Sequence, residues 1–163
     1  MMEPIGPYMT DAHRRAKNII ARAARDRKRL VLPHLKGDFI SRVRDPKVEW
    51  GIADTPFVID VGVWVDIVRK TDRPMGIEGE EQITSIALAI EIMQTAPSSE
   101  AKVQHCREAG IPLIEFSIAD CGSIEDLQHG VLSRAAKKRW LSVGAFEPYL
   151  HGWSQPMLIP VPR

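Results

Sequence analysis

Two apolar stretches decide the fold expected from this sequence: residues 57–68, which read FVIDVGVWVDIV, and residues 83–93, which read ITSIALAIEIM. Both are rich in Val or Ile, which favour strands, and the first lies between Pro56 and a polar turn cluster at 69–73. Their nearly continuous apolar character is typical of strands covered on both faces, as in the middle of an α/β sheet. We expect them to pair as a long antiparallel hairpin across the acidic connection at 76–81.

Further helices and strands are expected on both sides of this hairpin. Thr10 and Asp11 start an amphipathic basic helix, Leu30–Pro33 reads as a short strand, and the polar residues 34–46 read as a loop. After the hairpin, a helix at 99–109 ends before Gly110, a strand follows at 111–118, and a last helix covers 123–138. The order of helices and strands predicts an α/β fold.

Composition indicates one globular domain. The 163 residues are 44% hydrophobic and 26% charged, so the chain is long and apolar enough to bury a core of its own. We expect a single domain over 1–163, with an extended, proline-containing tail at 151–163. No apolar run reaches the length of a membrane span and the N-terminus lacks the pattern of an export signal, so a cytoplasmic location is expected. The two cysteines, without a CxxC, argue against a disulfide framework or a zinc ribbon.

Positive charge is concentrated at the front of the chain. The overall charge is +1, but residues 1–47 carry 12 Lys and Arg against 5 Asp and Glu. A basic stripe of this kind suits a polyanion such as nucleic acid, because phosphates are attracted to it and release counterions on contact. The candidate nucleic-acid-binding residues are Arg14, Arg15, Lys17 and Arg22. A solvated helix face is the alternative explanation.

Two acids, Asp66 and Glu91, stand inside the apolar strands. A buried carboxylate is costly unless it is paired, hydrogen-bonded or bound to a cation. On neighbouring strands the two side chains could converge, and two carboxylates with waters and a phosphate make the oxygen site that Mg²⁺ prefers. The alternative is that each acid is solvated near a strand end or bonded to an arginine.

A family resemblance supports the catalytic interpretation. Residues 87–118, ALAIEIMQTAPSSEAKVQHCREAGIPLIEFSI, resemble the central block of the CoiA-like competence nucleases and related bacterial proteins of the PD-(D/E)XK nuclease superfamily. Three further stretches agree in order and spacing: TDAHRRAKNIIARAARDRKRLVLP at 10–33, WVDIV at 64–68 and KKRWL at 137–141.

The resemblance implies a restriction-endonuclease-like αβββαβ core, a mixed central sheet flanked by helices. In such a core Asp66 and Glu91 would hold Mg²⁺ or Mn²⁺, and a lysine would orient or activate the attacking water. The sequence departs from the motif at Met93, which stands where the lysine is expected. Lys102 on the following helix has a stem long enough to reach back as a replacement, although a solvent-facing lysine is the alternative.

Four residues are supporting candidates: His13, which shares a helical face with Lys17, and Gln94, Thr95 and Glu115. The expected function is a metal-dependent nuclease that hydrolyses phosphodiester bonds in DNA, as a homodimer or within a larger assembly. The alternative is a degenerate nuclease fold that binds nucleic acid or a protein partner without cleaving it. Met93 is the feature that separates these two expectations.

Overall fold

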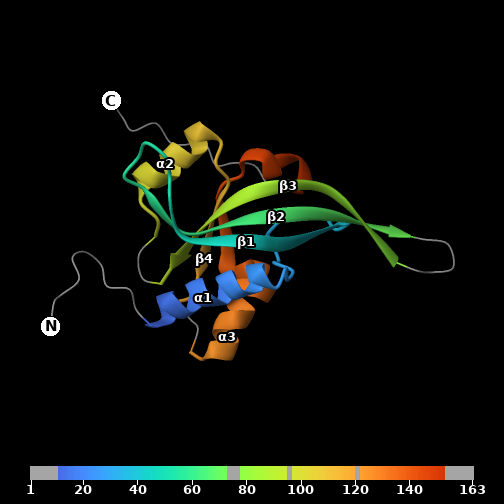
Figure 1. Ribbon diagram of the computed structural model, residues 1–163, viewed down its shortest axis with the longest axis horizontal. Helices are drawn as coiled ribbons and strands as arrows, with labels where there is room; N and C mark the ends of the chain where they lie inside the picture. Colours follow the sequence, from blue (N-terminus) through green and yellow to red (C-terminus); the bar gives the residue numbers. More distant parts are fainter. Residues whose placement is uncertain (1–10, 73–77, 95–96, 120–121, 153–163) are drawn as a thin grey trace.

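The computed structural model describes residues 11–72, 78–94, 97–119 and 122–152 (Figure 1). The described helices and strands are α1 (Asp11–Arg25), β1 (Phe39–Gly51), β2 (Val58–Asp72), β3 (Glu78–Met93), α2 (Glu100–Ala109), β4 (Leu113–Ser117), α3 (Ile124–Gln128) and β5 (Lys138–Ser142), with short helical turns at His129–Ser133, Ala135–Lys137 and Gly144–Tyr149. Thr10, Thr95, Cys121 and most of the tail expected at 151–163 lie outside the described residues. No helix within the described ranges is long and apolar enough to cross a membrane.

The five strands form one mixed sheet in the order β1-β2-β3-β4-β5. The first three strands run antiparallel in sequence order, β4 lies parallel to β3, and β5 lies antiparallel to β4. Helix α2 is the crossover that a parallel pair of strands requires. The expected hairpin is confirmed, since β2 and β3 pair from Asp72 and Glu78 at the tip to Val61 and Ile90 at the open end.

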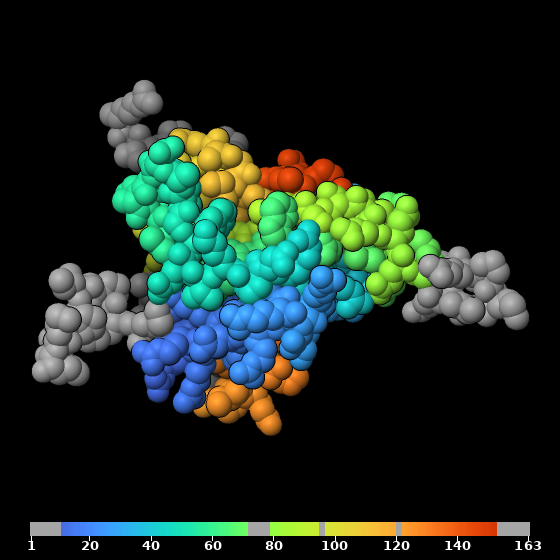
Figure 2. Space-filling model, in the orientation of Figure 1, coloured from blue at the N-terminus to red at the C-terminus, as the bar shows by residue number. Residues whose placement is uncertain are grey.

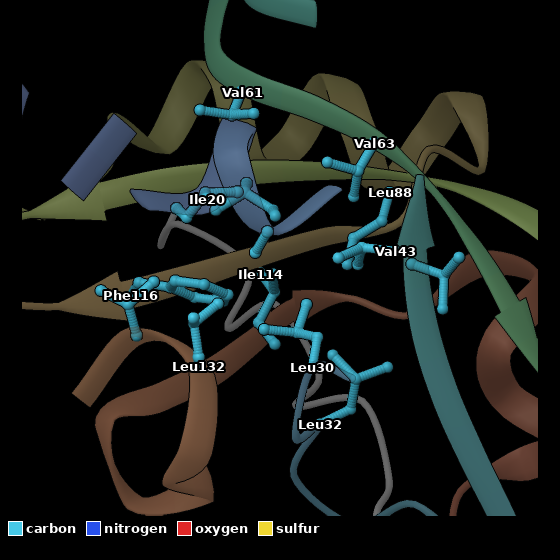
Figure 3. Packing of buried hydrophobic residues seen from close by; sticks show 14 of the residues in the cluster. Ile20, Leu30, Leu32, Val43, Val61, Val63, Leu88, Ile114, Phe116 and Leu132 are labelled. Atoms are coloured by element: carbon cyan, nitrogen blue, oxygen red, sulfur yellow. The ribbon is translucent and has the colours of Figure 1, made fainter. Parts of the chain in front are cut away.

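Apolar side chains fill both faces of the sheet. On one face, Ile20 of α1 and Leu132 pack with strand residues such as Val63, Leu88 and Ile114 (Figure 3). On the other face, a smaller cluster joins Cys106 of α2 to buried residues of the strands and of the loop after β1; its members are Ile52, Ile59, Ala89, Cys106, Leu113 and Leu141. Figure 1 shows α1 and α2 on opposite sides of the sheet. Coverage on both faces explains the apolar runs where the smaller cluster lies, whereas farther along the hairpin Trp64 of β2 is 43% exposed.

The first strand of the sheet begins inside the segment 34–46, where the sequence predicted a loop. Residues 30–33 form no extended strand, and β1 instead occupies Phe39–Gly51, with a register shift between Arg44 and Lys47. This strand is at the edge of the sheet, where a proline such as Pro46 is tolerated because its missing N–H is not needed in the ladder. Its polar sequence reflects that edge position.

The last expected helix is also wrong in its extent. It ends at Gln128 instead of continuing to 138, passes into a π-helical turn at His129–Ser133, and is followed by β5. Pairing with β4 holds Lys138–Ser142 extended, and the Trp140 indole N–H donates to Pro33 O at 2.8 Å. Contacts distant in sequence have therefore overridden the helical pattern.

Helix α2 ends at the predicted residue and begins one residue later than predicted, and its start positions a residue of the site. Ser99 is its N-cap, with Oγ accepting from the Lys102 N–H at 3.2 Å. Gly110 follows the helix with φ of 70°, the left-handed conformation that favours glycine. The cap fixes where Lys102 stands relative to the sheet.

Candidate active site

Two carboxylates meet at the open end of the β2–β3 hairpin. The ladder ends at the pair Val61 and Ile90, and the next residues outward are Asp60 and Glu91. The Asp60 N–H donates to Glu91 Oε2 at 3.0 Å, and the Ile92 N–H donates to Asp60 Oδ2 at 2.8 Å. Each strand therefore uses a backbone N–H to hold the carboxylate of the other, and the two acids form what we call the carboxylate pair.

Helix α1 places two side chains on the Asp60 half of the carboxylate pair. His13 Nε2 lies 3.3 Å from Asp60 Oδ1, and Lys17 Nζ lies 3.6 Å from the same oxygen. Lys17 Nζ also lies 3.4 Å from Glu49 Oε1. His13 and Lys17 are one helical turn apart, and burial of Ala16 orients that side of α1 toward the sheet.

Helix α2 supplies the cation on the Glu91 half. Lys102 Nζ donates to Glu91 Oε1 and, at 2.9 Å, to Val58 O. The side chain therefore reaches back to the acid of β3, as the sequence suggested, and is not a solvent-facing lysine. The carboxylate pair thus has a lysine on each side, one from each helix layer.

The two carboxyl groups have opposite acid–base properties. Burial and the charge of Asp60 raise the pKa of Glu91, and the hydrogen bond from Lys102 only partly offsets this. Burial also acts to raise the pKa of Asp60, but hydrogen bonds from His13 and the Ile92 N–H outweigh it, so that pKa is lowered. Asp60 is thus the more acidic member and Glu91 the more basic, a separation common at catalytic sites.

Glu115 extends the pair into a row of three acids across three strands. It stands opposite Glu91 in the parallel register of β3 and β4, and it is only 3% exposed. Its Oε2 accepts from the Ser98 N–H at 3.0 Å and from Ser98 Oγ at 3.1 Å. Its Oε1 accepts from Arg139 at 2.9 Å. Glu115 is therefore a neighbour of the carboxylate pair with partners of its own.

Asp66 does not belong to this group, which corrects the sequence-based pairing of Asp66 with Glu91. It stands opposite Ser85, six residues before Glu91 on β3, so the two acids are about 20 Å apart along the sheet. Arg44 Nε lies 3.1 Å from both Asp66 carboxylate oxygens, and Ser85 Oγ donates to one of them at 2.5 Å. A carboxylate bonded to arginine was the alternative left open for Asp66, and the structure shows it.

Asp60 is the residue that sequence reasoning missed. It lies in the same apolar run as Asp66, so the signal of an acid in a buried strand applied to both. Register separates them: with the hairpin tip between Asp72 and Glu78, Asp60 and Glu91 are almost equally far from the tip. Locating the tip in the sequence would therefore have selected Asp60.

The basic residues of α1 divide into two groups. Arg14, Arg15 and Arg22 are exposed, whereas Lys17 is 5% exposed and belongs to the site, which corrects its assignment to the nucleic-acid-binding surface. Helix α1, blue in Figure 2, forms part of the molecular surface on the face shown. Four further exposed bases follow along the chain: Arg25, Arg27, Lys28 and Arg29. We call these seven exposed bases the basic surface.

The carboxylate pair can contribute to a metal site without completing one. Among the residues described, no group of three or more His, Cys, Asp and Glu side chains is arranged to hold a metal ion. Mg²⁺ commonly takes one or two protein carboxylates and completes its shell with waters and substrate phosphate. Asp60 and Glu91 fit that donor set. Gln94 is half-buried just after β3.

Comparison of the chain with protein-family models, curated proteins and solved structures found no match.

Proposed function

We propose that this chain is a metal-dependent nuclease that hydrolyses phosphodiester bonds in DNA. The observation that carries the proposal is the carboxylate pair Asp60 and Glu91 with Lys102 bound to it. The order α1-β1-β2-β3-α2-β4, with β4 parallel to β3, agrees with the restriction-endonuclease-like core of the superfamily that the sequence resembles. An acid on β2 beside an acid on β3 is what that core requires.

Each residue of the site has a role in the proposed reaction. Asp60 and Glu91 would hold Mg²⁺ or Mn²⁺, which when bound would supply an activated water and stabilise the charge that develops on the phosphate. A lysine has three N–H donors, and Lys102 directs two at Glu91 and Val58, so the third can donate to an oxygen bound at the pair. His13 and Lys17 hold the Asp60 carboxylate in place.

Met93 favours a second candidate function, binding of nucleic acid without cleavage. It is the second residue after Glu91 in β3, where the motif of the resembling family has its lysine. Its thioether carries no charge and donates no proton to a water. If Lys102 does not replace the missing group, the fold and the basic surface remain suited to binding alone.

Cleavage assays with the purified chain separate the two candidates. We expect plasmid DNA to be nicked or degraded in the presence of Mg²⁺ or Mn²⁺, and the activity to disappear in chelator and return when metal is added back. Single-stranded, double-stranded and branched DNA are compared to define the substrate. Absence of cleavage on all three with either metal, alongside retained binding, would establish the binding function instead.

The basic surface is tested through the salt dependence of binding. Changing Arg14, Arg15 and Arg22 together to Gln should weaken binding to DNA of any sequence. The slope of log K against log salt should become shallower by about 2–3, because each lost phosphate contact removes one released counterion. Fluorescence anisotropy titrations at several salt concentrations measure both quantities.

A matched control removes the same charge elsewhere. Lys47, Arg69 and Lys70 are exposed bases on β1 and β2, and changing all three to Gln alters the net charge equally. This control should leave the slope nearly unchanged. Equal effects of the two triple variants would show that net charge, and not the basic face of α1, governs binding.

A further inference from the structure

We propose that Glu115 is a positioning residue that fixes the start of α2 and thereby holds Lys102 on Glu91. This inference rests on the proposed function for its catalytic consequence, but the contact that it describes can be tested independently. Glu115 binds Ser98 and Arg139, so its influence on Lys102 passes through the residues that it binds.

The first step is the double hydrogen bond to Ser98. Both the N–H and the Oγ of Ser98 donate to Glu115 Oε2, at 3.0 and 3.1 Å. One oxygen of a nearly fully buried carboxylate therefore holds both the backbone and the side chain of a single residue. Hydrogen bonds to a charged acceptor are stronger than neutral ones, so this contact is a firm anchor for the segment before α2.

The second step leads from Ser98 to Lys102 through the helix cap. Ser99, the next residue, is the N-cap of α2; its Oγ accepts from the Lys102 N–H at 3.2 Å, and its carbonyl accepts from the Val103 N–H at 3.1 Å. The backbone of Lys102 is thus tied to the residue beside the anchor. From that backbone position its amine reaches Glu91 and Val58.

The contact of Glu115 with Arg139 accounts for a carboxylate at this position. Arg139 on β5 donates to Glu115 Oε1 at 2.9 Å, and its side chain is 65% exposed, so it neutralises the buried acid from the surface. Both carboxylate oxygens accept hydrogen bonds, one from the α2 side and one from β5. A glutamine has only one acceptor oxygen, so it cannot satisfy Ser98 and Arg139 together.

Glu115→Gln is the direct test. We expect the Lys102 and Val103 amides to exchange with solvent at least about tenfold faster, because the first turn of α2 opens more readily without its anchor. In the cleavage reaction we expect kcat to fall about tenfold while KM stays unchanged, since Glu115 does not bind substrate. Combined with Lys102→Met, the variant should cause no further loss beyond that of Lys102→Met alone.

Two other variants keep the test decisive. Ser98→Ala removes only the hydrogen bond from Ser98 Oγ to Glu115. It should speed amide exchange at Lys102 and Val103 by a smaller factor, and this result tests the positioning role if Glu115→Gln does not fold. Glu108→Gln, on the exposed part of α2 beside Gln104, is the matched control and should leave exchange and kcat unaltered.

The outcomes distinguish this inference from the proposed function. Unchanged exchange at Lys102 in a folded Glu115→Gln variant overturns the positioning role, even if cleavage is lost. A further loss of kcat in the Lys102→Met background overturns it as well. If the unmodified chain cleaves no nucleic acid, the proposed function fails, while faster exchange in Glu115→Gln still establishes that Glu115 positions α2.

Discussion

Asp60→Asn and Glu91→Gln should each abolish DNA cleavage, a loss of roughly 10²–10³-fold or more in kcat. Either change replaces a carboxylate oxygen of the pair with an amide nitrogen, which repels a cation, while side-chain size is preserved. In the Glu91 variant, Lys102 should also lose the ion pair that it makes with the Glu91 carboxylate. Initial rates of plasmid nicking in Mn²⁺ and in Mg²⁺ measure the effect, and thermal unfolding checks that each variant is folded.

Asp66→Asn is the matched control for both variants. Asp66 lies on the same strand as Asp60, but Arg44 and Ser85 bind it about 20 Å from Glu91. Its removal should leave cleavage within a few-fold of the unmodified chain. The reverse pattern, with Asp66→Asn inactive and Asp60→Asn active, would contradict the site described above.

Lys138→Met should stabilise the protein at neutral pH by about 2–4 kcal/mol. Burial lowers the pKa of Lys138 from 10.5 to about 7. At pH 7, folding therefore removes the Lys138 proton from a large share of the molecules, whereas the unfolded chain keeps it. Methionine removes that cost. It also removes the hydrogen bond from Nζ to Arg134 O at 2.7 Å and the contact with the Phe116 ring, which limits the gain.

The pH dependence gives this prediction a defined sign. Between pH 10.5 and about pH 7 the unfolded chain binds a proton at Lys138 that the folded chain does not, so the free energy of unfolding falls as pH falls. Below about pH 7 both states are protonated and the contribution is constant. Urea unfolding from pH 6 to pH 10 should show this slope in the unmodified chain and a reduced slope in Lys138→Met.

Lys70→Met is the control for the lysine itself, since Lys70 is exposed on β2. This variant should leave the pH slope unaltered. It should change the free energy of unfolding by no more than about 0.5 kcal/mol. A Lys138→Met variant that keeps the full pH slope would show that Lys138 remains charged in the folded protein.

The parts of the fold that local signals specify could be predicted from the sequence. The β2–β3 hairpin follows from two apolar runs rich in Val or Ile, and α2 follows from Pro97 and Ser98 before it and Gly110 after it. The edge strand β1 could not be found this way, because charged residues such as Arg44, Asp45 and Lys47, together with Pro46, interrupt its apolar pattern. The extended state of β5 depends on pairing with β4, which no local pattern encodes.

The candidate site was predictable in composition but not in register. Glu91 was singled out as an acid in an apolar strand, Lys102 and His13 through the family resemblance, and the structure brings these three residues to one site. Lys17 joins them, although the sequence had assigned it to the nucleic-acid-binding surface. The acid of β2 was assigned to the wrong residue because Asp60 and Asp66 occupy the same kind of apolar run. Choosing between them requires the position of the hairpin tip, which the acidic connection expected at 76–81 does not give, because β3 already begins at Glu78.

The location of the carboxylate pair at the open end of the hairpin has a consequence for the order of folding. Pairs near the tip, such as Asp72 with Glu78, close the shortest loops and lose the least chain entropy, so the hairpin is expected to close from the tip toward its open end. Asp60 and Glu91 then meet late, when α1 and α2 also have to dock to bring in Lys17 and Lys102. A half-folded chain would therefore expose the basic surface before Asp60 and Glu91 have met. Under the proposed function, we expect such a chain to bind a polyanion before it is able to cleave one.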